Sequence, residues 1–278
     1  RGLGDVYKRQ KKNDRRRETV CKGDMMNSLE MNNIEEIKTL NPYQQEAVLD
    51  ESPACLVNAN VGSGKTTVLI EKVRHLHEKK QVSYEKMAVL TFTNKAAGEL
   101  KERLRNMLGG EEGDEVFAST FHSACVRILR RWAESIGYPR SFTIYDTDDS
   151  QRVMKAVYKE LSIDDKFFPI KSAINQMSRW KDQLVSPEEA LRTPARDTKG
   201  AIAAKVYAAY EKKLREAGAF DFDDLIYQTV QLLAEHEDVR EFYQNKYRYL
   251  LVDEYQDTSV AQFRLCLLYT SPSPRDTR

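Results

Sequence analysis

The main sequence evidence for the fold class is the segment Ala59-Asn60-Val61-Gly62-Ser63-Gly64-Lys65-Thr66. The residues before it, Ala54 to Ala59 (ACLVNA), form the short apolar run that is typical of a buried strand. The residues after it, from Lys65 to about Lys80, have the apolar period of a helix. Glycine lets the backbone between the two take positive φ. The sequence therefore predicts a strand, a glycine-rich turn and a helix in direct succession.

A turn of this kind, between a strand and a helix, is typical of a phosphate-binding loop. Its backbone N–H groups and the helix N-terminus would point at phosphate oxygens. We expect Lys65 to reach the β- and γ-phosphates of a nucleotide, and Thr66 to ligate Mg²⁺. The strict pattern has glycine where this chain has Ala59, and Asn60 offsets this in part because asparagine tolerates left-handed backbone. A chance Gly/Ser turn is the alternative, which the flanking strand and helix disfavour. The predicted loop residues are Ala59, Asn60, Val61, Gly62, Ser63, Gly64, Lys65, Thr66 and Thr67.

A second apolar strand, Tyr249 to Val252 (YLLV), ends in two carboxylates, Asp253 and Glu254. The carboxyl ends of parallel strands face the ligand crevice, so we expect this pair beside the phosphate loop. With Thr66, the two carboxylates would hold Mg²⁺, and Glu254 would accept a proton from water as a general base. A solvated turn would also carry two acids, and the phosphate loop elsewhere in the chain disfavours that alternative.

Strands and helices alternate in the first half of the chain. Strands are expected at Met87 to Phe92 and Val116 to Thr120, and helices at Asn94 to about Leu108 and Phe121 to about Ile136. This alternation predicts a parallel sheet with helices on both faces. From about Asp148 to Glu237 helix follows helix, with a capping box at Ser186 to Glu189. We therefore predict an α/β fold of the P-loop NTPase (RecA-like) class, interrupted by an inserted all-helical subdomain.

The predicted boundaries follow these shifts in pattern. Residues 1–30 are a leader, 31–147 the first part of the α/β domain, 148–219 the helical subdomain, 220–265 the return to the α/β domain, and 266–278 a tail. Arg1 to Gln10 and Cys266 to Arg278 have no helical or strand period and resemble translated adaptor or vector sequence. The basic stretch between them and the body is either a nucleic-acid-binding tail or a leader read in frame. We favour the leader, with a native start at Met25, Met26 or Met31.

The composition excludes several classes of protein. No apolar run approaches the roughly 18 residues that a membrane span needs, and the N-terminus lacks the apolar stretch of a secretory signal. The four cysteines have neither CxxC nor metal-ligand spacing, so we expect free thiols in a reducing cytoplasm. The net charge is +1 and residues 25–265 are net acidic. Any case for nucleic-acid binding must therefore come from local motifs.

Six blocks of the chain, in order, resemble the motifs of the UvrD/Rep/PcrA helicases of superfamily 1. They are Leu40 to Val48 (LNPYQQEAV), Ala59 to Thr66, Leu90 to Ala97 (LTFTNKAA), Ser119 to Ser123 (STFHS), Phe220 to Leu225 (FDFDDL) and Val252 to Thr258 (VDEYQDT). The phosphate loop is similar to the family's AGAGSGKT and departs from it at Asn60 and Val61. Nuclease–helicase subunits of the AddA/RecB type share two of these motifs, and the spacing of the other blocks favours the UvrD/PcrA branch.

The resemblance implies roles for particular residues. Gln44 would read adenine, and Gln256 would couple the γ-phosphate to DNA movement, acting with the catalytic residues Glu254 and Lys65. Two blocks would line a track for single-stranded DNA through Thr91, Phe92, Thr93, Asn94, Lys95, Thr120, Phe121, His122 and Ser123. Aromatic rings stack on bases without reading sequence, and hydroxyls, amides and lysine contact phosphates.

Two assignments stay open at this point. For Phe121, stacking on DNA and burial in the core are equally consistent with the sequence. The cluster of Arg127, Arg130 and Arg131 fits either contact with the DNA backbone or a solvated helix face.

The resemblance further implies a cytoplasmic, monomeric 3′→5′ DNA helicase that uses ATP and Mg²⁺, binds single-stranded DNA and its junctions with duplex, and acts in repair or replication. In that family a second motor domain supplies arginines of the kind worth about 10³–10⁵ in rate. Neither that domain nor the family's GDxxQSIYRWRGA block is found in this sequence, so we predict weak Mg–ATP binding and poor hydrolysis by the chain itself. A module that only binds nucleotide and single-stranded DNA is one alternative, and a P-loop ATPase acting on protein is another.

Overall fold

The computed structural model describes residues 40–60, 62–195 and 197–270, in two units that divide between Glu46 and Ala47. The described part of the first unit holds the start of α2 (Pro42–Leu49). Its cap is reciprocal, because the Gln44 N–H donates to Asn41 Oδ1 at 3.0 Å and the Asn41 N–H donates to Gln44 Oε1 at 2.9 Å. Pro42, which has no N–H to satisfy, occupies the first helical position.

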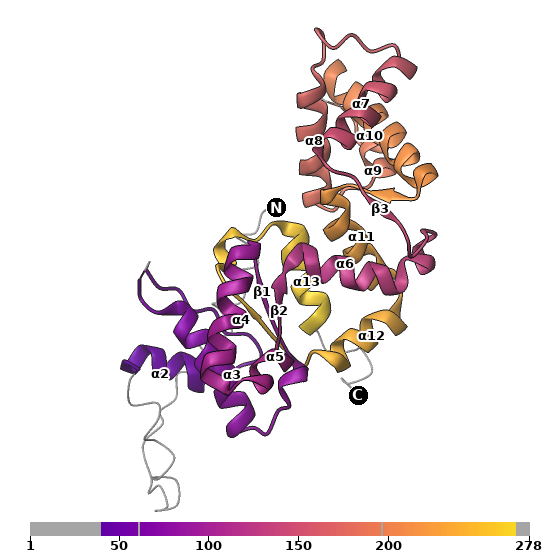
Figure 1. The fold of residues 1–278 in the computed structure, drawn as a ribbon. Coiled ribbons are helices and arrows are strands. Elements are labelled where there is room, and N and C mark those ends of the chain that lie inside the picture. Colours follow the sequence, from indigo (N-terminus) through magenta and orange to yellow (C-terminus); the bar gives the residue numbers. More distant parts are fainter. Residues whose placement is uncertain (1–39, 61, 196, 271–278) are drawn as a thin grey trace, which may run out of the picture. The chain divides into compact units, whose positions relative to one another are not determined.

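The centre of the second unit is a parallel sheet of three strands in the order β2-β1-β5 (Figure 1). The strands are β1 (Met87–Thr91), β2 (Phe117–Thr120) and β5 (Tyr249–Val252). In register, Val89 lies opposite Ala118 on one side and Leu251 on the other. Every residue of β1 is buried, as expected for a central strand covered on both faces. The predicted parallel sheet is confirmed.

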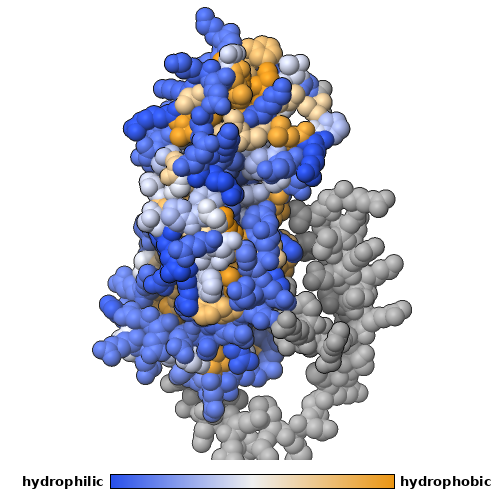
Figure 2. Space-filling view, turned by 90° about the vertical axis from the view of Figure 1, so that its right-hand side faces the viewer, coloured by the Kyte–Doolittle hydropathy of each residue, from blue (hydrophilic) through white to orange (hydrophobic). Residues whose placement is uncertain are grey.

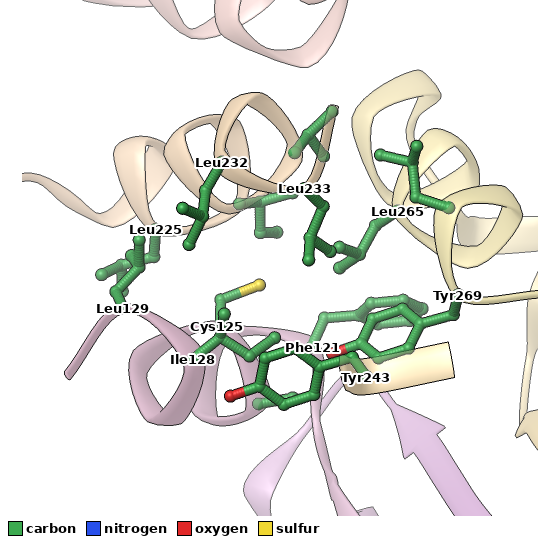
Figure 3. Close-up of a cluster of buried hydrophobic side chains, with 14 of the residues drawn as sticks. Phe121, Cys125, Ile128, Leu129, Leu225, Leu232, Leu233, Tyr243, Leu265 and Tyr269 are labelled. Carbon is green, nitrogen blue, oxygen red and sulfur yellow. The ribbon is translucent and has the colours of Figure 1, made fainter. Parts of the chain in front are cut away.

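Alternate residues of the strands face two different cores, because successive side chains of a strand point to opposite faces. Met87 and Val89 pack in one cluster with side chains of α3 (Lys65–Glu78) and α4 (Asn94–Leu108). Ala88 and Leu90 pack in the other with α6 (Phe121–Trp132), α11 (Phe222–Glu235) and α13 (Val260–Thr270). Figure 3 shows the second cluster, with Cys125, Leu233 and Leu265 pointing toward one another from three helices. Helices therefore cover both faces, as the sequence predicts.

The chain between α6 and α11 is mostly helical and has a core of its own. Met154, Met177 and Tyr207 belong to this cluster, which does not include any residue of the sheet. The remaining elements are α5 (Glu111–Glu115), α7 (Thr147–Glu160), α8 (Ile170–Asp182), α9 (Pro187–Arg192), α10 (Thr198–Ala217), α12 (Glu237–Lys246), the short strands β3 (Thr143–Ile144) and β4 (Ala219–Phe220), and the 3₁₀ turns η3 (Tyr84–Lys86), η4 (Ala133–Ile136) and η5 (Tyr255–Asp257). The two-residue strands β3 and β4 pair in parallel. The predicted capping box at Ser186 and Glu189 is present at the start of α9.

The strand predicted at Ala54 to Ala59 is wrong. These residues have no strand conformation, and Leu56 and Val57 are 58% and 41% exposed. The apolar run was expected to be buried, but a strand also needs a hydrogen-bonded neighbour. The sheet order of the described residues gives residues 54–59 no such neighbour.

The end of α13 also differs from the sequence prediction. The absence of helical period from Cys266 onward was misleading for residues 266–270, which continue the helix and bury Cys266, Leu268 and Tyr269. Burial on several sides removes the amphipathic period that would have indicated a helix. Of the predicted leader, residues 1–30, and the predicted tail, residues 266–278, only residues 266–270 are among the described residues.

Hydrophilic side chains cover most of the face in Figure 2, and apolar side chains show among them near the end made by α7–α10. Among the described residues, no helix has the length and apolar character that crossing a membrane requires. Cys55 is exposed and Cys125 and Cys266 are buried, and no disulfide joins any two of these three, while Cys21 lies outside the described residues. Burial raises the pKa of the Cys125 and Cys266 thiols to about 12.

Candidate nucleotide and DNA site

The loop before α3 has the backbone that a phosphate-binding turn requires. Gly62 and Gly64 have φ of 79° and 81°, in the left-handed region where only glycine is free of strain. Between them, the Ser63 N–H donates to Asn60 O at 3.2 Å. Lys65 then begins α3, a helix of 14 residues. A left-handed turn leading into a helix N-terminus turns backbone N–H groups toward an anion, so the loop fits a nucleotide phosphate. Val61 lies outside the described residues.

The side chain of Lys65 joins the loop to the end of β5. Its Nζ lies 3.4 Å from Ala59 O and 3.5 Å from Glu254 Oε2. Both side chains of this ion pair are partly exposed, at 24% and 43%. The two motifs that carry the predicted nucleotide chemistry are 188 positions apart in the sequence and adjacent in space.

The two carboxylates after β5 have different environments. The Asp253 N–H donates to Leu90 O at 2.9 Å, which places Asp253 directly at the carboxyl end of the sheet. Burial, and next the charge of Glu254, raise the pKa of Asp253 above its usual value, while Lys65 opposes them. The pKa of Glu254 is lowered, first by a hydrogen bond from the Gln256 amide and also by Lys65. Glu254 is therefore ionised at neutral pH, as a general base must be.

Glu254 also has φ of 52°, in the left-handed region. This conformation is uncommon for a residue with a Cβ and is found disproportionately at functional sites. Thr66 lies in the first turn of α3 and carries the hydroxyl that the sequence predicts to ligate Mg²⁺ with the carboxylates of Asp253 and Glu254. Hydroxyl and carboxylate oxygens are the donors that Mg²⁺ prefers, so these residues fit the expected metal.

The two blocks predicted to line a DNA track follow the neighbouring strands β1 and β2. Thr93 caps α4 by accepting the Ala96 N–H at 3.1 Å, and Thr120 caps α6 by accepting the Ser123 N–H at 3.2 Å. The exposed members of the two blocks are Thr93, Asn94, Lys95 and Ser123, and the buried ones are Thr91, Thr120 and Phe121. Phe121 is only 1% exposed, which assigns its ring to the core.

Three aromatic or imidazole rings lie near this edge of the sheet. Phe92 is half-buried, with its ring centroid 5.4 Å from that of Phe121. The half-buried His122 ring lies 5.3 Å from the ring of Phe222, which is 58% exposed. Burial lowers the pKa of His122 below its usual value, although Asp223 opposes this. Phe222 belongs to the FDFDDL block, whose sequence does not indicate a DNA contact, and its position beside His122 is visible only in the structure.

The comparisons with known proteins agree with this geometry. A model of the UvrD/REP helicase N-terminal domain matches residues 40–274. The chain belongs to the UvrD/REP helicase family. It is 44% identical over 232 residues to the ATP-dependent DNA helicase PcrA of Staphylococcus epidermidis. It is 43% identical to the protein of the same name from Staphylococcus aureus. Each alignment covers 84% of this chain and 32% of the relative, so the chain spans about a third of the length of these helicases.

The arginine cluster of this UvrD/REP helicase chain divides in two. Arg130 donates to the carbonyl oxygens of Arg140 and Phe142 and lies 3.8 Å from the Phe142 ring, so its role is structural. Arg127 and Arg131 are exposed and lie over the rings of Phe117 and Phe242, respectively.

Two further predicted residues have local partners. Gln256, on η5, donates its amide to the Glu254 carboxylate. Gln44, predicted to read adenine, belongs to the first unit and accepts the Asn41 N–H through its amide oxygen.

Proposed function

We propose that this chain is the ATP-binding part of an ATP-dependent DNA helicase motor, a RecA-like domain into which a helical subdomain, residues 148–219, is inserted. The observation that carries the proposal is the 3.5 Å contact between Lys65 Nζ and Glu254 Oε2. It places the phosphate loop and the acidic strand end at one edge of a parallel sheet, which is the arrangement that ATP hydrolysis needs. The names of the relatives, ATP-dependent DNA helicases, support the same activity.

The residues of the candidate nucleotide site have separate roles in the proposed hydrolysis. The loop amides and Lys65 bind the phosphates, and Lys65 turns from Glu254 to the γ-phosphate when nucleotide binds. Freed of its counterion, the Glu254 carboxylate accepts a proton from the attacking water. Thr66 and Asp253 would hold Mg²⁺, which neutralises phosphate charge. Gln256 keeps the Glu254 carboxylate oriented through its amide.

The exposed residues after β1 and β2 form the proposed DNA surface. Asn94, Lys95 and Ser123 are exposed donors suited to phosphates, and the rings of Phe92 and Phe222 are suited to stacking on bases. Contacts to phosphates and to the faces of bases carry no sequence information, which suits a translocase that must move along any sequence. Translocation in the 3′→5′ direction, a monomeric cytoplasmic protein and a role in repair or replication follow from the family resemblance and are part of the proposal.

Nucleotide binding by the full 278-residue chain tests the proposal. We expect calorimetry to detect weak Mg–ATP binding, and Lys65→Ala to reduce the affinity at least tenfold. Lys212→Ala, which removes a lysine from the exposed side of α10, is the matched control. Wild-type chain that folds but does not bind Mg–ATP contradicts the proposal.

A second candidate is a module that binds nucleotide and single-stranded DNA without turnover. The lack of strand conformation at residues 54–59 favours it, because a loop that does not follow a strand of the sheet is poorly preorganised for catalysis. Phosphate release with saturating oligo-dT separates the two. DNA-stimulated turnover of the chain supports the motor, and tight binding without turnover supports the module.

A further inference from the structure

One buried ammonium joins three elements on the helical side of the molecule. Lys181, on α8, lies with its Nζ 2.7 Å from Glu211 Oε1 on α10, 2.9 Å from Asp221 Oδ2 and 2.8 Å from Asp224 Oδ1. The Lys181 side chain is 2% exposed and that of Asp224 is 1% exposed. Lys181 donates a hydrogen bond to Asp221 Oδ2, whereas Glu211 Oε1 and Asp224 Oδ1 lie at ion-pair distance from the ammonium without accepting one. Lys181 occupies the centre of a carboxylate cluster whose oxygens would otherwise suit a metal ion.

The three carboxylates are not equivalent. Three negative charges around one positive charge in a buried site are unfavourable, so the cluster holds a proton. Burial, and next Asp221 and Glu211, raise the pKa of Asp224 well above its usual value. For Asp221, burial opposes ionisation, but Lys181 outweighs it and the pKa is lowered. Burial also raises the pKa of Glu211, so the site favours the neutral form at Glu211 and Asp224 and the ionised form at Asp221, the carboxylate that is hydrogen-bonded to Lys181.

Asp221 and Asp224 also build the first turn of α11. The Asp224 N–H donates to Asp221 Oδ1 at 2.8 Å, and the Asp221 N–H donates to Asp224 Oδ2 at 3.1 Å. Phe222 follows Asp221 and is the first residue of α11, and the centroid of its ring lies 5.3 Å from that of the His122 ring. The orientation of this turn sets the position of the Phe222 ring.

We propose that Lys181 is a positioning residue: through Asp221 it fixes the first turn of α11, holds Phe222 against His122, and thereby ties the helices α8 and α10 to the DNA surface. This inference rests on the proposed DNA binding for its functional consequence but on the buried contacts for its geometry. A change in the packing of α8 or α10 would alter the contact between Phe222 and His122 through the Lys181 side chain.

A buried ion pair that serves stability alone is the simpler explanation. Replacement of such a pair by apolar groups is often neutral, whereas loss of one partner leaves a buried charge. A purely stabilising pair would weaken nucleotide and DNA binding together. A positioning residue would change the first turn of α11 and DNA affinity while leaving the phosphate loop unaffected, because that loop is built by different elements.

The sharpest test compares the same chemical change at two positions three residues apart, in the full chain. Asp221→Asn removes the ionised partner of Lys181, although asparagine still caps a helix. Asp224→Asn makes the same change at a carboxyl that lies near Lys181 but accepts no hydrogen bond from it. Lys181→Arg keeps the cation, and Lys213→Met is the control, since Lys213 pairs with Glu160 of α7 inside the same helical region. Oligo-dT affinity by fluorescence anisotropy, Mg–ATP affinity and amide hydrogen exchange at residues 221–224 are measured for each.

We expect Asp221→Asn to raise the Kd for oligo-dT at least fivefold and to speed amide exchange in the first turn at least tenfold, with Mg–ATP affinity within twofold of wild type. Asp224→Asn, Lys181→Arg and Lys213→Met should stay within twofold of wild type on all three measurements. Equal effects of the two asparagine variants, or a parallel loss of nucleotide affinity, overturn the inference. If wild-type chain does not bind oligo-dT, the proposed DNA binding fails, and the exchange data alone decide whether Lys181 positions the turn.

Discussion

Glu254 combines an uncommon backbone conformation, an ion pair with Lys65 and a proposed catalytic role. It has a left-handed φ of 52°, and its carboxylate pairs with Lys65, the lysine that we propose binds the phosphates. The pair therefore competes with nucleotide for Lys65. The same carboxylate is the proposed base, so a single substitution separates binding from hydrolysis.

Glu254→Gln should strengthen Mg–ATP binding several-fold and reduce any hydrolysis by about 10²–10⁴. The amide removes both the ion pair with Lys65 and a negative charge near the triphosphate. Calorimetry and phosphate release measure the two effects, with Glu111→Gln on the surface of α5 as control. Weaker ATP binding by Glu254→Gln would show that the carboxylate helps to hold the nucleotide.

His122 should titrate below its usual pKa of 6.5, because burial disfavours the imidazolium. Folding then favours the neutral ring. The free energy of unfolding is unaffected by this group above about pH 6.5 and falls as the pH drops from 6.5 toward the folded-state pKa. An NMR titration of the ring gives the pKa directly. His122→Phe should flatten this part of the stability profile, and a ring that titrates at or above 6.5 contradicts the prediction.

At the scale of elements, α4 and α5 pack closely enough to require a glycine. A Cβ at Gly113 would lie 2.6 Å from Arg105 Cα and 2.7 Å from Leu104 O. These are backbone atoms of α4, so they cannot move aside as a side chain would. Gly98, in the same α4, has no atom within 4 Å of an added Cβ.

Gly113→Ala should lower the free energy of unfolding by about 1–3 kcal/mol, the usual cost of overpacking. Gly98→Ala, the same change at an open helical position, should raise it by about 0.5–1 kcal/mol, because alanine loses less backbone entropy than glycine in a helix. Urea unfolding of both variants measures the difference. A stabilising Gly113→Ala would show that α5 is not held against α4 in solution.

The α9 capping box offers a second test at this scale. The Ser186 hydroxyl accepts the Glu189 N–H at 3.1 Å, and the Glu189 carboxylate accepts the Ser186 N–H at 2.9 Å. Ser186→Ala should cost about 1 kcal/mol, as loss of an N-cap does. Ser186→Asp preserves an acceptor at the cap and should lose less than half as much in the same urea titration. Equal losses in the two variants would mean that the cap does not stabilise α9.

On the scale of the whole second unit, stability comes from three clusters, and the segment before the phosphate loop contributes to none of them. Two clusters pack on opposite faces of the sheet and the third lies within α7–α10. Leu56 is 58% exposed, whereas Leu129 is fully buried in the cluster of Figure 3. Substitution of the two leucines should therefore lower the free energy of unfolding by very different amounts.

Leu129→Ala should destabilise the chain by about 2–5 kcal/mol, the range for a buried leucine. Leu56→Ala should cost less than about 0.5 kcal/mol, as surface substitutions do. Thermal unfolding followed by circular dichroism compares them. A large loss for Leu56→Ala would place residues 54–59 in a sheet after all.

Most of the helices, the three parallel strands and the two candidate nucleotide motifs can be predicted from local sequence alone. Those features depend on local patterns: the apolar run of β5, the period of α4 and the glycines that begin α3 each act within a few residues. The candidate residues came from short motifs whose spacing is itself local, which is why Lys65 and Glu254 were identified before their contact was known.

Which of these residues are exposed to solvent and which are buried depends on the packing of the whole chain, and local sequence does not specify it. Phe121 and Phe92 occur in similar blocks, and the covering helices bury one ring and leave the other half-exposed. The predicted strand at Ala54 to Ala59 failed because pairing depends on a neighbour elsewhere in the chain, which no local apolar run specifies. The Lys181 cluster could not be predicted from the sequence for the same reason. Its members come from three elements up to 43 positions apart, and only packing converts ordinary charged residues into one buried network.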